Sequence, residues 1–242
     1  MVQALPLDDA EGQAARDLSG GENPGSYFDS NGYGGALLTF QQAGPTPDTL
    51  AVELTGDDSG IDMIETQGGG NNDFGGDWNG NLYSAICWMK VDAAARWTDG
   101  TTYRYGWHVR DGADATYYSI MGKNTTNHQI EWRRRTGGPI TALTHTFNPS
   151  GPTDWFCMGV TFDQSKPLLS AYLWDSTNGF QAIGNSESEW LVDWGDHSPT
   201  AGTSLIGAGS LTLQEWLGLH SLTITWAGIE LSLAEIRKAM TP

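Results

Sequence analysis

Apolar residues recur at every second position along much of the chain, which is the pattern of β-strands. The stretch 82–91 shows it most clearly, because both sets of alternate residues are largely apolar. One set is Leu82, Ser84, Ile86 and Trp88, and the other is Tyr83, Ala85, Cys87 and Met89. A strand with two apolar faces must be covered on both sides, so we predict an inner strand here.

Other stretches with this alternation come in pairs joined by turn-forming residues. A short polar turn separates 155–162 from 168–174, and a second one separates 117–121 from 129–134. We predict both pairs as antiparallel hairpins. Many short strands, frequent turn signals, and the lack of a linker or repeat predict an all-β antiparallel sandwich that forms one domain over residues 1–242.

The end of the chain departs from the alternation after a late strand predicted at 221–226. Ser232 is a favourable helix N-cap, and Glu235 follows it at the spacing of a capping box. The apolar stripe of this helix consists of Leu233, Ile236 and Met240. Because so short a helix is only marginally stable alone, we predict that it docks on the sandwich, over an edge or an open end of the core.

Six stretches are similar, in order along the chain, to segments of one known superfamily. They are 5–28 with its Asp17, Ser19 and Gly20 turn, 86–93 around Trp88, 154–163, 169–175, 203–209 and 221–240. Together they resemble the laminin-G-like members of the concanavalin A-like lectin/glucanase superfamily. The resemblance implies a jelly roll of two antiparallel sheets with a short C-terminal helix. His220 and Ser221 stand where that family usually has an acidic pair, which weighs against a family-type metal site there.

The charge balance narrows the range of partners. The chain has 29 Asp and Glu against 12 Lys and Arg, a formal net charge of −17, and should repel nucleic acids and anionic membranes. It has no apolar stretch of about 20 residues that could span a membrane, and its N-terminus lacks the features of a signal peptide. Cys87 and Cys157 lie in apolar strands, so we predict reduced, buried thiols.

The superfamily includes retaining glucanases, which use paired carboxylates. The nearest match is Glu187, Glu189 and Asp193, but the first and last lie roughly 20 Å apart along a regular strand. Retaining pairs are only about 5–5.5 Å apart, so a solvated strand face is the better interpretation. The polar run 196–198 holds the three residue types of a hydrolase triad, but adjacency in sequence does not make one. We therefore predict a protein that is not an enzyme.

Oxygen-rich side chains recur in the glycine-rich loop before residue 82. Asp77, Asn79 and Asn81 stand at alternate positions with Asp73 nearby, like the first half of a calcium-binding loop. Leu82 stands where such a loop needs glycine, and a second acidic cluster contains Asp57, Asp58 and Asp62. No cofactor is required by these patterns, and calcium remains an alternative to a solvated acidic loop.

Aromatic side chains are candidate platforms for sugar rings, with Asp and Asn fixing the ring's orientation. Trp78 and Trp97 lie in polar segments, so we predict that they are exposed and bind carbohydrate together with Asn79 and Asn81. The weaker candidates are Tyr103, Tyr105, Trp107, Trp132, Trp190 and Trp194. Alternation would place Tyr103, Tyr105 and Trp107 on one strand face, which core packing also explains.

Three of the 12 basic residues are consecutive: Arg133, Arg134 and Arg135. They favour either a solvated strand end or a docking surface for an acidic partner subunit. The function we predict is that of a non-catalytic, lectin-like interaction module. The favoured form is a virion surface protein of a phage, a head decoration or tail-associated protein, that attaches to a particle and binds host glycans.

A free soluble carbohydrate-binding lectin is the alternative, and a glucanase-like hydrolase is a more distant one. The expected partners are capsid or tail subunits, glycans or further copies of this chain, without nucleic acid or membrane insertion. The expected location is the virion surface or, otherwise, the cytoplasm or a release route that needs no signal peptide.

Overall fold

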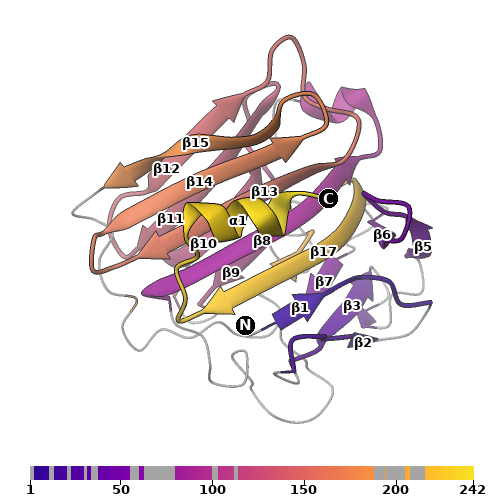
Figure 1. Cartoon of the computed structure of the whole chain (residues 1–242), viewed down its shortest axis with the longest axis horizontal. Helices are drawn as coiled ribbons and strands as arrows, with labels where there is room; N and C mark the ends of the chain where they lie inside the picture. Colours follow the sequence, from indigo (N-terminus) through magenta and orange to yellow (C-terminus); the bar gives the residue numbers. More distant parts are fainter. Residues whose placement is uncertain are drawn as a thin grey trace.

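In a computed structural model the chain forms two β-sheets and one short α-helix (Figure 1). The structure describes residues 3–10, 14–20, 23–29, 32–33, 38–54, 60–62, 80–99, 103–111, 114–187, 194, 205–207 and 216–242. Every strand pair in these ranges is antiparallel. The predicted antiparallel sandwich is therefore confirmed.

Sheet A has the strand order β15-β14-β13-β8-β17-β6-β5, and β1 also pairs with β17. Its strands are β1 (Gln3–Leu5), β5 (Thr39–Ala43), β6 (Leu50–Leu54), β8 (Leu82–Val91), β13 (Phe156–Asp163), β14 (Leu168–Asp175), β15 (Gly179–Glu187) and β17 (Gly218–Ala227). The pairing of β13 with β14 confirms one predicted hairpin.

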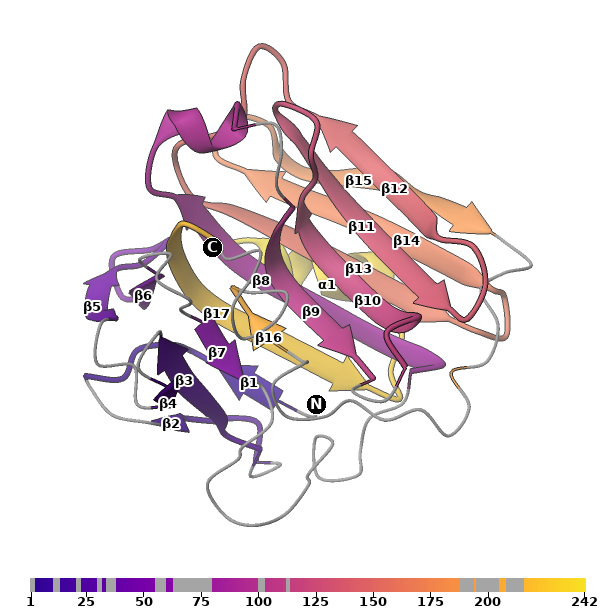
Figure 2. The same cartoon turned by 180° about the vertical axis from the view of Figure 1, so that it is seen from behind.

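Sheet B has the strand order β12-β11-β10-β9-β16-β7-β3-β2, and β4 also pairs with β3. Its strands are β2 (Ala14–Ala15), β3 (Gly25–Asp29), β4 (Gly32–Tyr33), β7 (Gly60–Asp62), β9 (Arg104–Arg110), β10 (Tyr117–Lys123), β11 (Gln129–Thr136), β12 (Thr141–Thr146) and β16 (Leu205–Ile206). The pairing of β10 with β11 confirms the second hairpin. Figure 2 shows β9 to β12 as a layer lying over sheet A.

The main core lies between the two sheets, and β8 contributes to it along its whole length. Tyr83, Ala85, Cys87 and Met89 face this core, as the alternation predicts. Ile86 and Trp88 point the other way, into a second apolar cluster on the outer face of sheet A. Both cysteines are free and buried, which confirms the prediction of reduced thiols.

The helix α1 (Leu233–Met240) covers that second cluster and lies across the outer face of sheet A (Figure 1). Its capping box is present, because the Ser232 hydroxyl accepts from the Glu235 amide while the Glu235 carboxylate accepts from the Ser232 amide. The expectation that it covers an edge or an open end is wrong. Trp88, Tyr172 and their neighbours make this face apolar, so the face needs a cover. Ile236 and Met240 are buried against it, whereas Leu233 is exposed.

The 3-10 helix η2 (Ala94–Trp97) follows β8 and leads to one end of the sandwich. Neither helical segment that the structure describes has the length and apolar character needed to span a bilayer.

Candidate functional site

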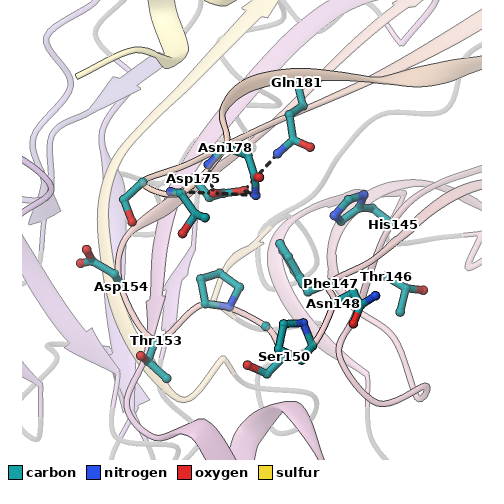
Figure 3. Close-up of a pocket in the computed structure, with 15 residues that line it drawn as sticks. His145, Thr146, Phe147, Asn148, Ser150, Thr153, Asp154, Asp175, Asn178 and Gln181 are labelled. Carbon is teal, nitrogen blue, oxygen red and sulfur yellow. Dashed lines mark hydrogen bonds between the residues drawn. The ribbon is translucent and has the colours of Figure 1, made fainter.

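A cleft of about 560 Å³ opens where the outer strands of the two sheets, β12 and β15, come into contact. Its lining residues come from two segments, 145–154 from the end of β12 onward and 175–181 around the turn from β14 to β15. Figure 3 shows Asp175, Asn178 and Gln181 on one side and His145, Phe147 and Asn148 on the other. We call this feature the rim cleft.

Asp175 organises the first wall of the rim cleft. Its carboxylate is buried and accepts hydrogen bonds from the backbone amides of Thr177 and Asn178, at 2.9 and 2.7 Å. It also accepts from the side-chain amides of Asn178 at 3.1 Å and Gln181 at 3.0 Å (Figure 3). An aspartate that binds the backbone two and three residues ahead is typical of a tight turn. The two amide oxygens, which face no donor among the described residues, are left to accept from a ligand.

The second wall is a loop held from beneath by Trp97. The indole Nε1 of Trp97 donates to the Pro152 carbonyl at 2.8 Å, and the amide of Gly151 donates to His128 Nδ1 at 3.2 Å. Gly151 lies so close to the Trp97 ring that a Cβ atom there would come within 2.2 Å of it. The loop is therefore fixed in place, and its Ser150 and Thr153 side chains are exposed at the cleft.

The side chains that line the rim cleft are either acidic or uncharged at pH 7. Asp154 and Asp175 supply carboxylates, and the pKa of His145 is lowered by burial, which the nearby Asp175 only partly offsets. His145 is consequently neutral at pH 7. Its ring packs edge-on against the Phe147 ring, with 4.9 Å between the centroids. Hydroxyls, amides and carboxylates around a fixed hollow can orient a polyhydroxylated ligand by hydrogen bonds.

The predicted sugar platform Trp97 does not face solvent, so the expectation of an exposed ring is wrong. Its exposed fraction is 0%, because Phe147, Phe156 and Trp216 surround it with ring centroids 5.3, 5.8 and 6.5 Å away. The polar residues next to Trp97 in the sequence indicated exposure, but the ring is buried and supports the loop of the rim cleft.

Four other predicted residues, Trp78, Asn79, Asp73 and Asp77, lie outside the described residues. Asn81 is described, and its side-chain oxygen accepts from the backbone amide of Trp194 at 2.7 Å. That bond ties two distant segments together. Carbohydrate binding and calcium binding in this loop therefore stay predictions.

The arginine run is neither a solvated strand end nor one docking surface. Arg134 is fully buried, with its guanidinium 3.8 Å from the Phe162 ring centroid and 5.0 Å from that of Trp194. Successive residues of a strand point to opposite faces, so Arg134 enters the core while its neighbours point out. Arg133 pairs with Glu131 at 2.7 Å, and Arg135 donates to the Gly138 carbonyl.

Tyr103, Tyr105 and Trp107 do not share one face, contrary to the alternation. Trp107 packs in the core between the sheets, whereas Tyr105 belongs to a cluster with Tyr118. The register of β9 against β10 shifts at this point, since Met121 pairs with Trp107 and Gly122 with Tyr105. Because such a bulge inserts one extra residue, the side chains before it point to the opposite face of the sheet from the one that alternation predicts.

Arg133 lies close to the tyrosine side chains that cluster beside it on the outer face of sheet B. Arg133 lies 4.5 Å from the Tyr103 ring centroid, and burial raises the pKa of Glu131 in spite of its pairing with Arg133. Tyr105 and Tyr118 are both less than a tenth exposed. We call Tyr103, Tyr105, Tyr118, Glu131 and Arg133 the tyrosine cluster.

Of the carboxylates considered for catalysis, Glu187 is exposed at the end of the outer strand β15. Glu189, Asp193 and the run 196–198 lie outside the described residues, as do Asp57, Asp58 and the Trp190 side chain. Among the residues that the structure does describe, no three histidine, cysteine, aspartate or glutamate side chains lie together as a metal site would require.

Comparison of the sequence with protein-family models and with curated proteins finds no match. Comparison of the fold with solved structures does find matches. The CBM40 module of the Ruminococcus gnavus IT-sialidase, bound to α2,6-sialyllactose, matches with a TM-score of 0.53 and 10% identity over 78% of this chain and 96% of its own. The receptor-binding domain of botulinum neurotoxin type G matches with a TM-score of 0.58 and 12% identity over 98% of this chain and 50% of its own.

The fold is a concanavalin A-like, laminin-G-like jelly roll. A family GH54 α-L-arabinofuranosidase soaked with 4-nitrophenyl α-L-arabinofuranoside also matches, with a TM-score of 0.57 and 10% identity over 93% of this chain and 48% of its own. Identities this low establish the fold alone. Attachment to a virus particle and the cellular location stay predictions.

Sequence reasoning missed the rim cleft itself. The segment 175–179 carries a clear turn signal, with Asp at its start and Gly at its end. The segment 148–154 is rich in Pro, Ser and Gly, which indicates a loop. Nothing in either segment indicates that the two meet, because their encounter depends on the contact between β12 and β15.

Proposed function

We propose that this protein is a non-catalytic carbohydrate-binding module whose ligand occupies the rim cleft. The observation that carries the proposal is a fixed hollow lined by polar atoms that make no hydrogen bond with the described residues. Ser150 and Thr153 present exposed hydroxyls, and Asn178 and Gln181 present amide oxygens, on walls already held by internal hydrogen bonds. A preformed site loses little conformational entropy when a ligand binds.

The fold supports the same choice as an analogy. Solved jelly rolls of this kind include a module bound to sialyllactose and a glycosidase soaked with an arabinofuranoside. The absence of catalysis is supported by the state of Asp175, whose two oxygens accept hydrogen bonds from its own turn. A carboxylate held in this way stabilises a loop and is poorly placed to transfer protons to a ligand.

The test begins with a glycan array probed with the labelled protein. A variant that combines Ser150→Ala, Thr153→Val and Asn178→Ala then removes three ligand contacts of the cleft. Each lost hydrogen bond contributes about 0.5–1.5 kcal/mol, so the affinity for the best array glycan should fall by at least about tenfold. The matched control is Asn185→Ala, an exposed amide farther along β15, which should bind as the parent does.

Three outcomes would reject the proposal. An array without any bound glycan would reject carbohydrate binding. Full affinity in the triple variant would show that the glycan binds outside the rim cleft. Release of shorter products from the bound glycan, followed by chromatography over a day, would reject a non-catalytic module.

A further inference from the structure

A second depression, of about 590 Å³, lies beside the rim cleft. Its lining residues include Gln41, Thr46 and Thr49 from the segment 41–49, together with Lys90 of β8 and Trp155. We call it the Lys90 depression. Asp154 lines both hollows, so they adjoin at this residue.

Asp154 is suited to contact a ligand from both sides. One of its carboxylate oxygens accepts from the backbone amide of Trp155 at 2.8 Å, which orients the side chain. The other oxygen makes no hydrogen bond with the described residues, and the side chain is exposed. Figure 3 shows Asp154 at the margin of the rim cleft, far from His145 and Asn148.

The turn between β5 and β6 contributes to the lining and is held by its own hydrogen bonds. The amide of Gly44 donates to the Thr49 carbonyl at 2.9 Å, and the amide of Thr46 donates to the Thr49 hydroxyl oxygen at 2.9 Å. Pro45 and Pro47 restrict the backbone further. Ser221 donates from its hydroxyl to the Leu50 carbonyl at 2.7 Å, which anchors the turn to β17. The Lys90 depression is therefore preformed, like the rim cleft.

Lys90 is the only positively charged residue among those that line the depression. Its backbone is fixed, because the Trp216 indole donates to the Lys90 carbonyl at 3.1 Å. Its ammonium group has no ion pair with the described residues, whereas Lys123 and Lys166 are both paired with carboxylates. In a chain of net charge −17, a cation left unpaired at a hollow is available to donate hydrogen bonds to a ligand.

We propose that the two hollows form one extended site, in which an oligosaccharide passes over Asp154 from the rim cleft into the Lys90 depression. This inference rests on the proposed function and adds the class of ligand, a glycan chain longer than the rim cleft can hold. Each hollow alone has the volume of a small-molecule site, so the far end of the chain has room of its own. Lys90 donates to its ring and hydroxyl oxygens, and Asp154 accepts from hydroxyls at the crossing.

The experiment measures affinity against chain length by isothermal titration calorimetry. The probes are xylo-, cello-, manno- and chito-oligosaccharides of two to six units, starting with the series that the array favours. For the parent protein, affinity should rise by about tenfold between the disaccharide and the hexasaccharide, because only the longer chain gains a hydrogen bond from the charged Lys90 side chain. Lys90→Met keeps the aliphatic stem and should abolish this rise while the disaccharide binds as before.

The matched control is Lys238→Met, the same loss of charge at an exposed position of α1, which should leave the rise intact. Equal affinity for all lengths in the parent, combined with loss of binding in the rim-cleft triple variant, would overturn the extended site and leave the proposed function standing. A Lys90→Met variant that weakens disaccharides and hexasaccharides alike would also overturn it. Failure of every glycan to bind would overturn both proposals.

Discussion

Arg134 and the rim cleft can be compared as two polar regions of the same sandwich. The Arg134 guanidinium lies inside the core among the rings of Tyr83, Phe162 and Trp194. The rim cleft has its polar groups on turns, where Asp175 holds one wall and the loop over Trp97 forms the other. The first region holds a guanidinium group and large aromatic rings, on which sugars often stack, whereas the rim cleft is lined mainly by hydroxyl, amide and carboxylate side chains.

The difference shows that residue type alone does not locate a binding site. Arginine and tryptophan have large apolar surfaces, so the core can use them as well as a ligand can. Asn178 and Ser150 add little to the core, and their exposure at a fixed hollow is the stronger sign of ligand contact. Four predictions test this contrast, in order of expected effect.

Trp97→Ala should destabilise the protein most, because it removes a fully buried ring from among Phe147, Phe156 and Trp216. We expect a loss of about 3–5 kcal/mol in the free energy of unfolding, measured by urea denaturation. Ser150→Ala at the cleft surface is the control and should change it by less than about 0.5 kcal/mol. Unchanged stability together with lost glycan binding would mean that the Trp97 ring contacts ligand.

Arg134→Ala should destabilise by about 2–4 kcal/mol, because it removes both packing and cation–π contacts from the core. Arg135→Ala, one residue along and partly exposed, should cost less than about 1 kcal/mol. Guanidinium denaturation of the two variants measures the difference. Equal losses for the pair would contradict the opposite facing of these arginines.

His220 should make stability fall as the medium becomes acidic. Burial lowers its pKa to about 3, whereas a histidine in the unfolded chain titrates near 6.5. Between these values the unfolded state binds the proton and the folded state does not, so stability is lost as the pH falls below about 6.5. The slope is about 1.4 kcal/mol per pH unit, or about 2 kcal/mol by pH 5.

The His220→Gln variant lacks this titration, so its unfolding free energy should depend less on pH between 6.5 and 5. Urea denaturation at four pH values gives both slopes. Identical slopes for the parent and the variant would show that His220 is protonated in the folded state or titrates normally.

Asp175→Asn should have the smallest effect on stability, about 1 kcal/mol, because an amide can replace some but not all of the hydrogen bonds that the carboxylate accepts. Glycan affinity should fall as well, since Asn178 and Gln181 lose the group that positions them. Thermal melting and calorimetry give the two values, with Asp154→Asn as the stability control. An Asp175→Asn variant with full affinity would show that this turn does not shape the site.

Local features of the fold could be predicted from the sequence, because their causes are local. The capping box at Ser232 and the two hairpins depend on residues a few positions apart. The two faces of β8 follow from strict alternation. The place of α1 could not be predicted, since it depends on which sheet face is apolar after the strands have assembled.

The candidate site was harder to predict, because its parts are brought together by tertiary structure. Trp97 is surrounded by rings that follow it by 50 or more positions, so its polar neighbours in the sequence misled the prediction. The bulge in β9 reversed Tyr105 relative to Trp107. The rim cleft itself exists only where β12 and β15 meet.

The most direct test of ligand binding in the rim cleft is an NMR titration of the ¹⁵N-labelled protein with the best glycan from the array. The proposed site predicts that the largest amide shifts fall in 145–154 and 175–181, the two segments of the rim cleft. Largest shifts around the tyrosine cluster on β9 to β11, with the rim-cleft amides unmoved, would contradict it.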